Sequence, residues 1–311
     1  MNYAKFVTEQ VEEIKQTVGK DKAVSALSGG VDSAVATVIA HKALGRKLKV
    51  IFIDDGLMRQ DEPAQVKEDF RKLGIPVRII NAKRTFFAAL KGLTDPEDKR
   101  KAFRDTFYKT FKKAVKDTGA RYLIQGTIAA DIIETKKAVK TQHNVLEQIG
   151  IDPKRGYGFV AIEPLKTLFK PGVRKVGQAL GLPEKMHQRM PFPGPGLLCR
   201  CLGEVTPKRI EVVRQACAIV EKETMKLKPF QTFAVLMSDR ATGLDKDGGR
   251  HFGDIIAIRC VESRNAMTAK ATKIPWPILA RTSRKLLKEL PSVTKVLYDL
   301  SPKPPSTIEY I

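Results

Sequence analysis

The chain has 311 residues, enough for two domains of ordinary size with substantial cores. Its net charge of +22 fits nucleic acid, polyanionic small substrates, an acidic partner or a soluble Lys-rich surface equally well. Because the chain has no long apolar run, no apolar leader and no C-x-x-C pair among its four cysteines, we expect a reduced, cytoplasmic protein without a membrane span, zinc site or disulfide framework.

The first half of the sequence alternates helices with short buried strands. Apolar spacing predicts a helix over residues 1–20 and a strand over 23–27, which leads into a second helix ending near residue 44. Helices separate further predicted strands, so we expect an α/β fold, a doubly wound parallel sheet with helices on both faces. An aromatic stripe at helical spacing is interpreted as core: Phe103, Phe107 and Phe111. The further strands are predicted at 49–53, 77–80, 122–124 and 159–162.

A turn that reads SGGVDS, residues 28–33, stands between the first strand and the second helix. At such a turn the first backbone N–H groups and the positive helix end form an anion site. The two glycines let a phosphate approach the backbone, and the two serines add hydroxyl donors. The aspartate suits Mg²⁺ or a donor rather than a phosphate. The alternative is a Ser/Gly turn that merely starts a helix.

Polar residues follow two of the other predicted strands. Asp54 and Asp55 come after the second strand, where ligands bind in open α/β sheets, although an ordinary acidic turn has the same composition. Beyond the fourth strand, carboxylates and lysines over residues 131–144 suit a Mg²⁺–pyrophosphate complex. A charged surface loop is the alternative for that segment.

The composition changes after about Met186, and we place a domain boundary there, with domains over 1–188 and 189–311. Residues 190–196 are too rich in Pro and Gly for a helix or a central strand. The remainder predicts a smaller α+β domain, with a Gly/Asp-rich loop over 238–253. The tail from Ser301 looks disordered by composition.

The SGGVDS turn resembles the SGGxDS pyrophosphate loop of N-type ATP pyrophosphatases, and the chain has no Walker A Gly-Lys-Ser or Gly-Lys-Thr. Enzymes of this class split ATP between the α and β phosphates and transfer AMP. The resemblance implies an adenine nucleotide alpha hydrolase-like fold for the sheet domain.

Motifs over nearly the whole chain resemble the ATP-pyrophosphatase part of GMP synthetase. Two of them, PFPGPG and KPPxTIE, are absent from other enzymes with the SGGxDS loop. The matching segments are DDGLMR at 54–59, QGTI at 125–128, DIIE at 131–134, KTQHNV at 140–145, PFPGPG at 191–196 and KPPSTIE at 303–309.

The sequence departs from this family in the segment that resembles its lid. Gln142 stands where a first lid histidine is usual, and residues 146–148 read Leu-Glu-Gln instead of Gly-Gly-Leu. Met190 stands where a histidine often precedes PFPGPG. These departures concern individual contacts and leave the implied reaction class unchanged.

The resemblance also implies the partners. Bifunctional members carry an N-terminal glutaminase with a catalytic cysteine, but no cysteine precedes Cys199 here. The chain therefore resembles the separate synthetase subunit of the two-subunit form, which takes ammonia from solution or from a separate glutamine amidotransferase. Because the family's second domain is a dimerisation domain, a homodimer is expected.

The implied reaction is adenylation of XMP by Mg²⁺-ATP with release of pyrophosphate, followed by attack of ammonia, which gives GMP and AMP. The implied ATP and pyrophosphate ligands are Ser28, Gly29, Gly30, Val31, Asp32, Ser33, Ala34, Ile53, Leu57, Gly126 and Thr127. The implied metal ligands are Asp32, Asp131 and Glu134, and the implied catalytic residues are Asp32, Lys136, Lys140 and His143.

XMP is expected to meet the Pro/Gly loop and the tail, with Lys303 on its 5′-phosphate and Glu309 accepting from a purine N–H. For Arg240 and Arg250 a solvated surface position is the alternative, and for His143 a purely structural role. The implied XMP ligands are Pro193, Gly194, Arg240, Arg250, Lys303, Thr307, Ile308 and Glu309.

Two other functions remain open from the sequence. A tRNA-modifying ATP pyrophosphatase would use the same loop and the positive charge, with Cys199 and Cys201 as a sulfur-transfer pair, although we expect no nucleic-acid partner. A basic nucleotide-binding scaffold for a glutaminase would bind ATP without turnover.

Overall fold

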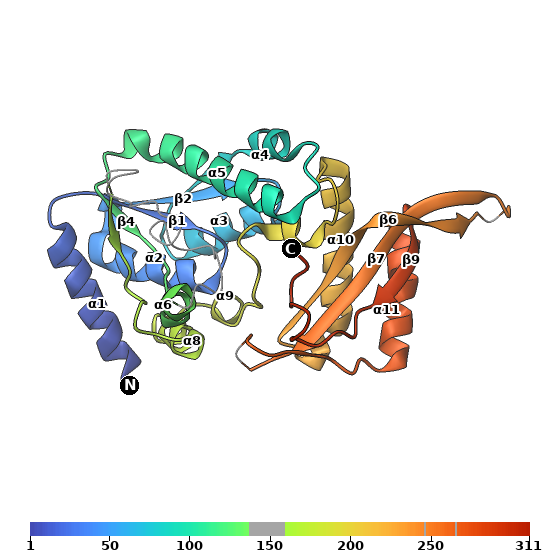
Figure 1. Cartoon of the computed structure of the whole chain (residues 1–311). Helices are drawn as coiled ribbons and strands as arrows, with labels where there is room; N and C mark the ends of the chain where they lie inside the picture. Colours follow the sequence, from blue (N-terminus) through green and yellow to red (C-terminus); the bar gives the residue numbers. More distant parts are fainter. Residues whose placement is uncertain (137–158, 246, 265) are drawn as a thin grey trace. The chain divides into compact units, whose positions relative to one another are not determined.

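The computed structural model describes residues 1–136, 159–245, 247–264 and 266–311 (Figure 1). The chain divides into two compact units, and each of them combines segments that lie far apart in the sequence. The first unit contains Met1–Asp54, Glu62–Ala82 and Tyr108–Arg189; the second contains Asp55–Asp61, Lys83–Phe107 and Met190–Ile311.

The two folded units are thus not simply the two halves of the chain. Residues 55–61 and 83–107, which the sequence analysis assigned to the first domain, belong to the second unit. The roles assigned to the two predicted domains stay predictions. Across the described residues, every helix is too short or too polar to span a bilayer.

The first unit is built on a five-stranded parallel sheet with the order β3-β2-β1-β4-β5. Ala23, at the start of β1, pairs with Leu48 on one side and Tyr122 on the other. The chain therefore winds outward in both directions from β1, which confirms the predicted doubly wound α/β fold and places the topological switch point between β1 and β4. The strands are β1 (Ala23–Leu27), β2 (Leu48–Asp54), β3 (Val77–Asn81), β4 (Tyr122–Ile124) and β5 (Val160–Ile162).

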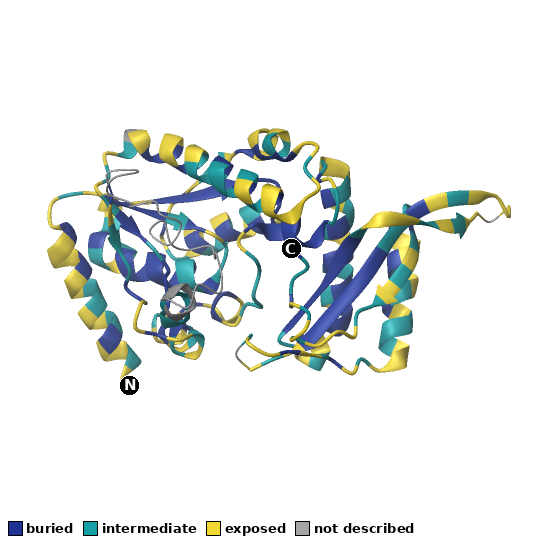
Figure 2. Ribbon diagram, in the orientation of Figure 1, coloured by how far each residue is buried: buried dark blue, intermediate teal, exposed yellow. Residues whose placement is uncertain are grey.

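Helix α2 (Val31–Leu44) is the central helix of this unit. It packs against β1 and against α1 (Tyr3–Val18), α8 (Lys170–Ala179) and α9 (Glu184–His187). Figure 2 shows that α2 is buried along most of its length, as its nearly continuous apolar sequence requires. The other elements are 3-10 turns η1 (Gly45–Lys47) and η2 (Lys116–Thr118), helices α3 (Glu62–Lys72) and α6 (Ala129–Lys136), and the last turns of α5 (Pro96–Val115).

The second unit is α+β, as predicted. Its central strand β7 pairs antiparallel with β6 and β8 and parallel with β9. Figure 2 shows the buried part of β6 and β7 beside α10, which also packs against α11. The elements are α4 (Lys83–Leu90), η3 (Gly196–Arg200), α10 (Pro207–Thr224), η4 (Met225–Leu227), β6 (Gln231–Leu244), β7 (Arg250–Glu262), β8 (Lys270–Ala271), α11 (Trp276–Glu289) and β9 (Val293–Tyr298).

Two expectations for the second unit were wrong. The predicted loop over 238–253 is mostly strand, because β6 and β7 continue as a hairpin arm that is largely exposed and therefore reads as polar and Gly-rich. The tail is not disordered: Ile308 and Ile311 are buried, although the tail's composition predicts no packing. Of the aromatic stripe, Phe103 and Phe111 are buried, as expected of core residues.

Candidate active site

The loop of residues 28–33 connects the carboxyl end of β1 to the first turn of α2, as the sequence predicts. Gly29 has a φ of 74°, a left-handed angle that favours glycine. The Ser33 hydroxyl accepts from Ser28 N–H at 3.2 Å and donates to Gly30 O at 3.1 Å, which closes the loop on itself. Gly30 is the N-cap and has no side chain to occupy the first N–H groups of α2, so within the described residues no capping side chain competes with an anion for these donors.

The end of β4 approaches this loop very closely at Gly126. A Cβ on Gly126 would lie 2.7 Å from both Asp32 C and Ser33 N. Because both atoms belong to the backbone, no side-chain movement could relieve the overlap. Glycine is therefore required in the QGT segment so that the start of α2, which follows β1, can lie beside the end of β4. The carboxyl ends of β1 and β4 meet at the switch point.

A lysine that the sequence analysis did not identify lies beside the loop. Lys170, the first residue of α8, places its Nζ 2.5 Å from Asp32 Oδ2. The other carboxylate oxygen, Oδ1, is buried and has no hydrogen-bond partner within the described part of the chain. One oxygen of Asp32 is thus neutralised by a cation, and the other remains able to accept a metal or a donor.

A second ion pair, Arg189–Glu62, also contacts the loop. Arg189 Nη1 donates to Gly29 O at 2.6 Å, and its Nη2 lies 2.6 Å from Glu62 Oε1. Glu62 is almost fully buried, with 1% of its side chain exposed. A Cβ on Gly29 would lie 2.3 Å from that Glu62 oxygen, so this close packing is a second reason for glycine at position 29.

The predicted ligands that follow β4 are partly engaged within the protein. The Thr127 hydroxyl donates to Glu163 Oε1 at 2.5 Å, and Asp131 Oδ2 accepts from Ile128 N–H at 3.0 Å. Glu134 and Lys136 lie in α6, where the structure does not describe their side chains. Lys140 and His143 lie outside the described residues.

Among the remaining predicted nucleotide ligands, Val31, Ala34 and Ile53 are buried in the first unit. Leu57 belongs to the second unit and is fully buried. Its carbonyl accepts from Leu197 N–H at 2.7 Å. In the described ranges no three His, Cys, Asp or Glu side chains gather closely enough to hold a metal ion by themselves.

The PFPGPG loop packs against residues 56–59 within the second unit. Gly196 has a φ of 62°, and a Cβ there would lie 2.3 Å from Leu57 O. Arg59 donates to the carbonyl of Pro191 at 3.3 Å, and its guanidinium lies 4.2 Å from the centre of the Phe192 ring. The loop is therefore held by residues that precede it by more than a hundred positions.

The tail is anchored by a buried arginine that sequence reasoning missed. Arg200 is fully buried and donates to both carboxylate oxygens of Glu309, from Nε to Oε2 at 3.1 Å and from Nη2 to Oε1 at 2.9 Å. Gln231 Nε2 also donates to Glu309 Oε1, at 2.5 Å. Burial alone would lower the pKa of Arg200, but Glu309 and Cys217 raise it above its ordinary value, so the guanidinium stays charged.

The other predicted XMP ligands are divided between two places. Lys303 Nζ donates to Ala266 O at 2.7 Å, and Thr307 O accepts from the buried Arg259 at 3.0 Å. Pro193 is half-buried and Gly194 is exposed. Arg240 and Arg250 lie on the β6–β7 arm, which projects away from the tail (Figure 1). The structure does not bring these two arginines to Lys303 and Glu309.

The four cysteines are buried free thiols. Burial raises the pKa of Cys199 to about 12 and also raises the pKa values of Cys201, Cys217 and Cys260. Since the thiolate is the reactive form, none of the four is suited to sulfur transfer at neutral pH.

Sequence reasoning missed Lys170, Arg189, Arg200 and Arg259. Each partner of these cations lies far away in the sequence, so no spacing indicates the pair. The only signal in the sequence is position: Lys170 begins a predicted helix of the sheet domain, and Arg189 and Arg200 flank the PFPGPG loop.

A doubly wound sheet with a glycine-rich anion loop at its switch point defines the class of nucleotide-binding α/β proteins. Within this class, the family described as NAD synthase matches residues 2–194, and the GMP synthase C terminal domain matches residues 218–310. The chain belongs to the GMP synthase family, among the members that form a separate subunit, and the resemblance inferred from its motifs is confirmed.

Three relatives show how far the similarity extends, and each is named as a subunit of a glutamine-hydrolysing GMP synthase. The relative from Pyrococcus abyssi is 48% identical, with both chains fully covered. The protein with the same name from Archaeoglobus fulgidus is 49% identical, again over the whole of both chains. That of Methanocaldococcus jannaschii is 45% identical over 98% of each chain.

Proposed function

We propose that this chain is the synthetase subunit of a two-subunit GMP synthase, an ATP-dependent carbon–nitrogen ligase. It adenylates XMP, releases pyrophosphate and replaces AMP by ammonia. The observation that carries this proposal is the end-to-end similarity to GMP synthase subunits at up to 49% identity, on a chain whose anion loop is fully formed. Because those relatives are named as one subunit of a glutamine-hydrolysing enzyme, their names support a separate glutaminase as the ammonia source.

The loop would bind the departing pyrophosphate through backbone N–H groups at the start of α2 and the hydroxyl of Ser33. These donors are fixed before the reaction by the hydrogen bonds within the loop and by Arg189, so they need no rearrangement as charge develops. Lys170 would add a positive charge at the same edge of the sheet. The lysines of the predicted lid, Lys136 and Lys140, keep their proposed role at the α-phosphate.

The residues present fit a Mg²⁺ ion that arrives with ATP. Asp32 offers a buried carboxylate oxygen that has no partner among the described residues, and Mg²⁺ in such sites takes one or two carboxylates together with phosphate oxygens and water. Asp131 and Glu134 are the proposed further ligands. When bound, Mg²⁺ would neutralise charge on the phosphates.

XMP binding is proposed for the second unit, at the PFPGPG loop and the tail. Lys303 would hold the 5′-phosphate, with Pro193, Gly194, Thr307 and Ile308 beside the ligand. For Glu309 the proposal must include Arg200 and Gln231, because they already occupy its carboxylate. Arg240 and Arg250 fit better as surface cations of the arm.

We further propose a homodimer formed through the second unit. Large apolar side chains are exposed there on the β6–β7 arm, on α11, on β9 and after it, and burial of such side chains between two copies would favour association. Free cysteines and nucleotide substrates agree with the proposed cytoplasmic location. The exposed residues are Leu244, Phe252, Trp276, Leu297 and Leu300.

The test is to supply the chain with XMP, Mg²⁺-ATP and ammonium and to measure GMP, AMP and pyrophosphate. Equal amounts of all three products support the proposal, and Asp32→Asn should abolish them. Pyrophosphate release that requires tRNA instead of XMP would favour the tRNA-modifying alternative. ATP binding without any turnover, even with the glutaminase present, would favour a scaffold.

A further inference from the structure

The peptide between Gly29 and Gly30 is the part of the anion loop whose orientation its own residues control least. Gly30 has a φ of −79°. Rotation of this peptide by half a turn would change ψ of Gly29 and φ of Gly30, and a glycine adopts a positive φ about as readily as a negative one. The two glycines that let a phosphate approach the backbone therefore also leave the orientation of their shared peptide undetermined.

This orientation decides which backbone group faces an anion. In a trans peptide the carbonyl and the N–H point to opposite sides. Gly30 N–H donates to Ser28 Oγ at 3.4 Å, and this hydroxyl lies 3.0 Å from Ser33 Oγ. The N–H therefore points to the side where the loop gathers its hydroxyl donors. A rotated peptide would place the negative end of the carbonyl dipole there and would repel an anion.

Arg189 holds the carbonyl of the same peptide on the other side. Its Nη1 donates to Gly29 O at 2.6 Å, and its own carbonyl accepts from Arg174 Nη2 at 3.4 Å, which ties the arginine to α8. A hydrogen bond from a charged donor is about twice as strong as one between neutral groups. Rotation of the peptide would break this bond, so Arg189 favours the observed orientation.

Glu62 fixes the guanidinium of Arg189 in turn, through the 2.6 Å ion pair to its Nη2. A carboxylate with 1% of its side chain exposed is costly to bury unless it is paired. Glu62 is also the first residue of α3, where the helix dipole favours an acidic side chain, so a role confined to α3 is the alternative. Its oxygen lies directly against the loop, however, because a Cβ on Gly29 would be 2.3 Å away from it.

We propose that Arg189 and Glu62 are positioning residues for pyrophosphate release, an inference that rests on the proposed function of the anion loop. Together they hold the peptide of residues 29–30 in the orientation that offers Gly30 N–H to the departing pyrophosphate. Their charges cancel, so the pair acts by orienting a donor and adds little to the positive potential of the site.

The first test is Arg189→Met, which keeps a long side chain and removes the donor to Gly29 O. The kcat for XMP-dependent pyrophosphate release should fall about 100-fold, the effect of losing one preorganised N–H donor, while the KM for XMP stays unchanged. The affinity for pyrophosphate with Mg²⁺, measured by calorimetry, should fall about tenfold. Arg189→Lys should restore part of both losses, because an ammonium can still donate to the carbonyl.

A double variant separates positioning from folding. Arg189→Met also lowers stability, because it removes the cation that is paired with the buried Glu62 carboxylate. Arg189→Met/Glu62→Leu removes both charges and should recover the free energy of unfolding in urea. It should keep the full loss of kcat and of pyrophosphate affinity, because residue 189 still donates nothing to Gly29 O. Recovery of activity together with stability would overturn the proposal and leave the pair a structural role.

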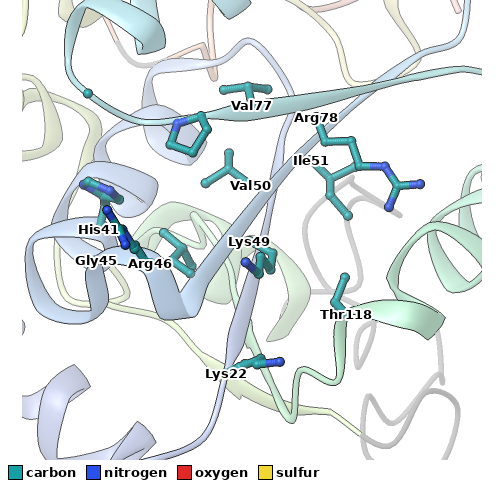
Figure 3. Close-up of a pocket in the computed structure, with 13 residues that line it drawn as sticks. Lys22, His41, Gly45, Arg46, Lys49, Val50, Ile51, Val77, Arg78 and Thr118 are labelled. Atoms are coloured by element: carbon teal, nitrogen blue, oxygen red, sulfur yellow. The ribbon is translucent and has the colours of Figure 1, made fainter.

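Arg78→Met is the matched control. Arg78 is an exposed arginine of the same unit near the amino end of β3, whereas the anion loop follows the carboxyl end of β1 in the same parallel sheet. Figure 3 shows it beside Ile51, its partner in β2. Arg78→Met should keep both kcat and pyrophosphate affinity. Equal losses in Arg78→Met and Arg189→Met would overturn the proposal, because they would indicate net charge alone.

Pyrophosphate binding also distinguishes failure of this inference from failure of the proposed function. A chain that binds pyrophosphate but forms no GMP from XMP would refute the synthetase function, and the variants would still test the pair through binding. Arg189→Met that binds pyrophosphate as tightly as the original chain would overturn the positioning role, whatever the substrate of the enzyme.

Discussion

The anion loop of the first unit and the tail anchor of the second unit, formed by Arg200, Gln231 and Glu309, treat their polar groups in opposite ways. The loop keeps polar backbone groups available, and it does so by excluding side chains: a Cβ on Gly29 or Gly126 would overlap neighbouring atoms. In the tail anchor the polar side chains bind one another. Arg200, Glu309 and Gln231 satisfy one another in a place where Arg200 has no exposed surface.

This difference indicates what each region is able to do. A site with unused donors can bind a ligand without first breaking protein contacts. A buried ion pair such as Arg200–Glu309 holds its segment in place, and removal of one partner leaves a costly unpaired charge. The loop should therefore be sensitive in activity, and the tail anchor should be sensitive in stability.

The largest effect is expected for Gly126→Ala. The new methyl group would lie 2.7 Å from Asp32 C and Ser33 N and would force β4 and α2 apart. XMP-dependent pyrophosphate release should fall about 1,000-fold, or about 4 kcal/mol in transition-state stabilisation. In the control Gly172→Ala, in α8, the methyl group makes ordinary contact with the Leu168 side chain, at 3.4 Å or more, and activity should be retained. A Gly126→Ala enzyme with more than half of the activity would contradict the close-approach argument.

Arg200→Met tests the other side of the comparison. Glu309 would lose its ion pair, and the free energy of unfolding in urea should fall by about 3–5 kcal/mol. The double variant Arg200→Met/Glu309→Gln should recover part of that loss, because no unpaired charge remains. Arg71→Met, which breaks an exposed pair with Glu68, should leave the urea midpoint unchanged. Equal effects of the two arginine variants would refute a special role for burial.

Lys170→Gln tests whether the cation beside Asp32 acts on the reaction. Loss of its charge should lower kcat for pyrophosphate release about 100-fold, and Lys170→Arg should restore part of it. Lys185→Gln is the matched control, because Lys185 forms an ion pair of the same length, 2.5 Å, with Asp69 in the same unit. If both lysine variants kept full activity, Lys170 would serve only to pair with Asp32.

The smallest effect concerns pH and the second unit. The Cys199 thiol keeps its proton in the folded chain up to about pH 12, whereas burial does not protect the unfolded thiol, which titrates near pH 9. Its contribution to stability is therefore complete below pH 9 and is lost as the pH rises toward 12. Between pH 8 and pH 10.5 the free energy of unfolding should fall by about 2 kcal/mol less in Cys199→Ala than in the original chain. If the free energies of unfolding of Cys199→Ala and of the original chain fell in parallel over this pH range, the Cys199 thiol would not be the group responsible.

The sequence predicted the anion loop because the loop is local. The strand, the two glycines and the helix of residues 23–44 are consecutive, and their pattern alone indicates both structure and chemistry. The cations that complete the sites could not be predicted this way. Lys170 lies 138 residues from Asp32, and Arg200 lies 109 residues from Glu309.

Composition misled the interpretation in the second unit. The arm of β6 and β7 is exposed over much of its length, so its residues have no buried face that would impose strand alternation. The tail is ordered by Arg259 and Arg200, which bind Thr307 O and the Glu309 carboxylate. Because the arginines that hold the tail lie far away in the sequence, the tail itself carries no pattern that would predict its ordered structure.

The interleaving of the two units has a consequence for biosynthesis. Lys99 is fully buried in the finished second unit, where its ammonium donates to the carbonyls of Cys201 and Gly203, each at 2.9 Å. These acceptors leave the ribosome about a hundred residues after Lys99, a delay of about 5–20 s at 5–20 residues per second. During that interval the ammonium of Lys99 lacks both of these acceptors, although Phe86 and Phe103 of the same segment can already meet. The second unit is therefore completed after the first, and a ribosome that stalls between these positions would expose α5 with Lys99 lacking its acceptors.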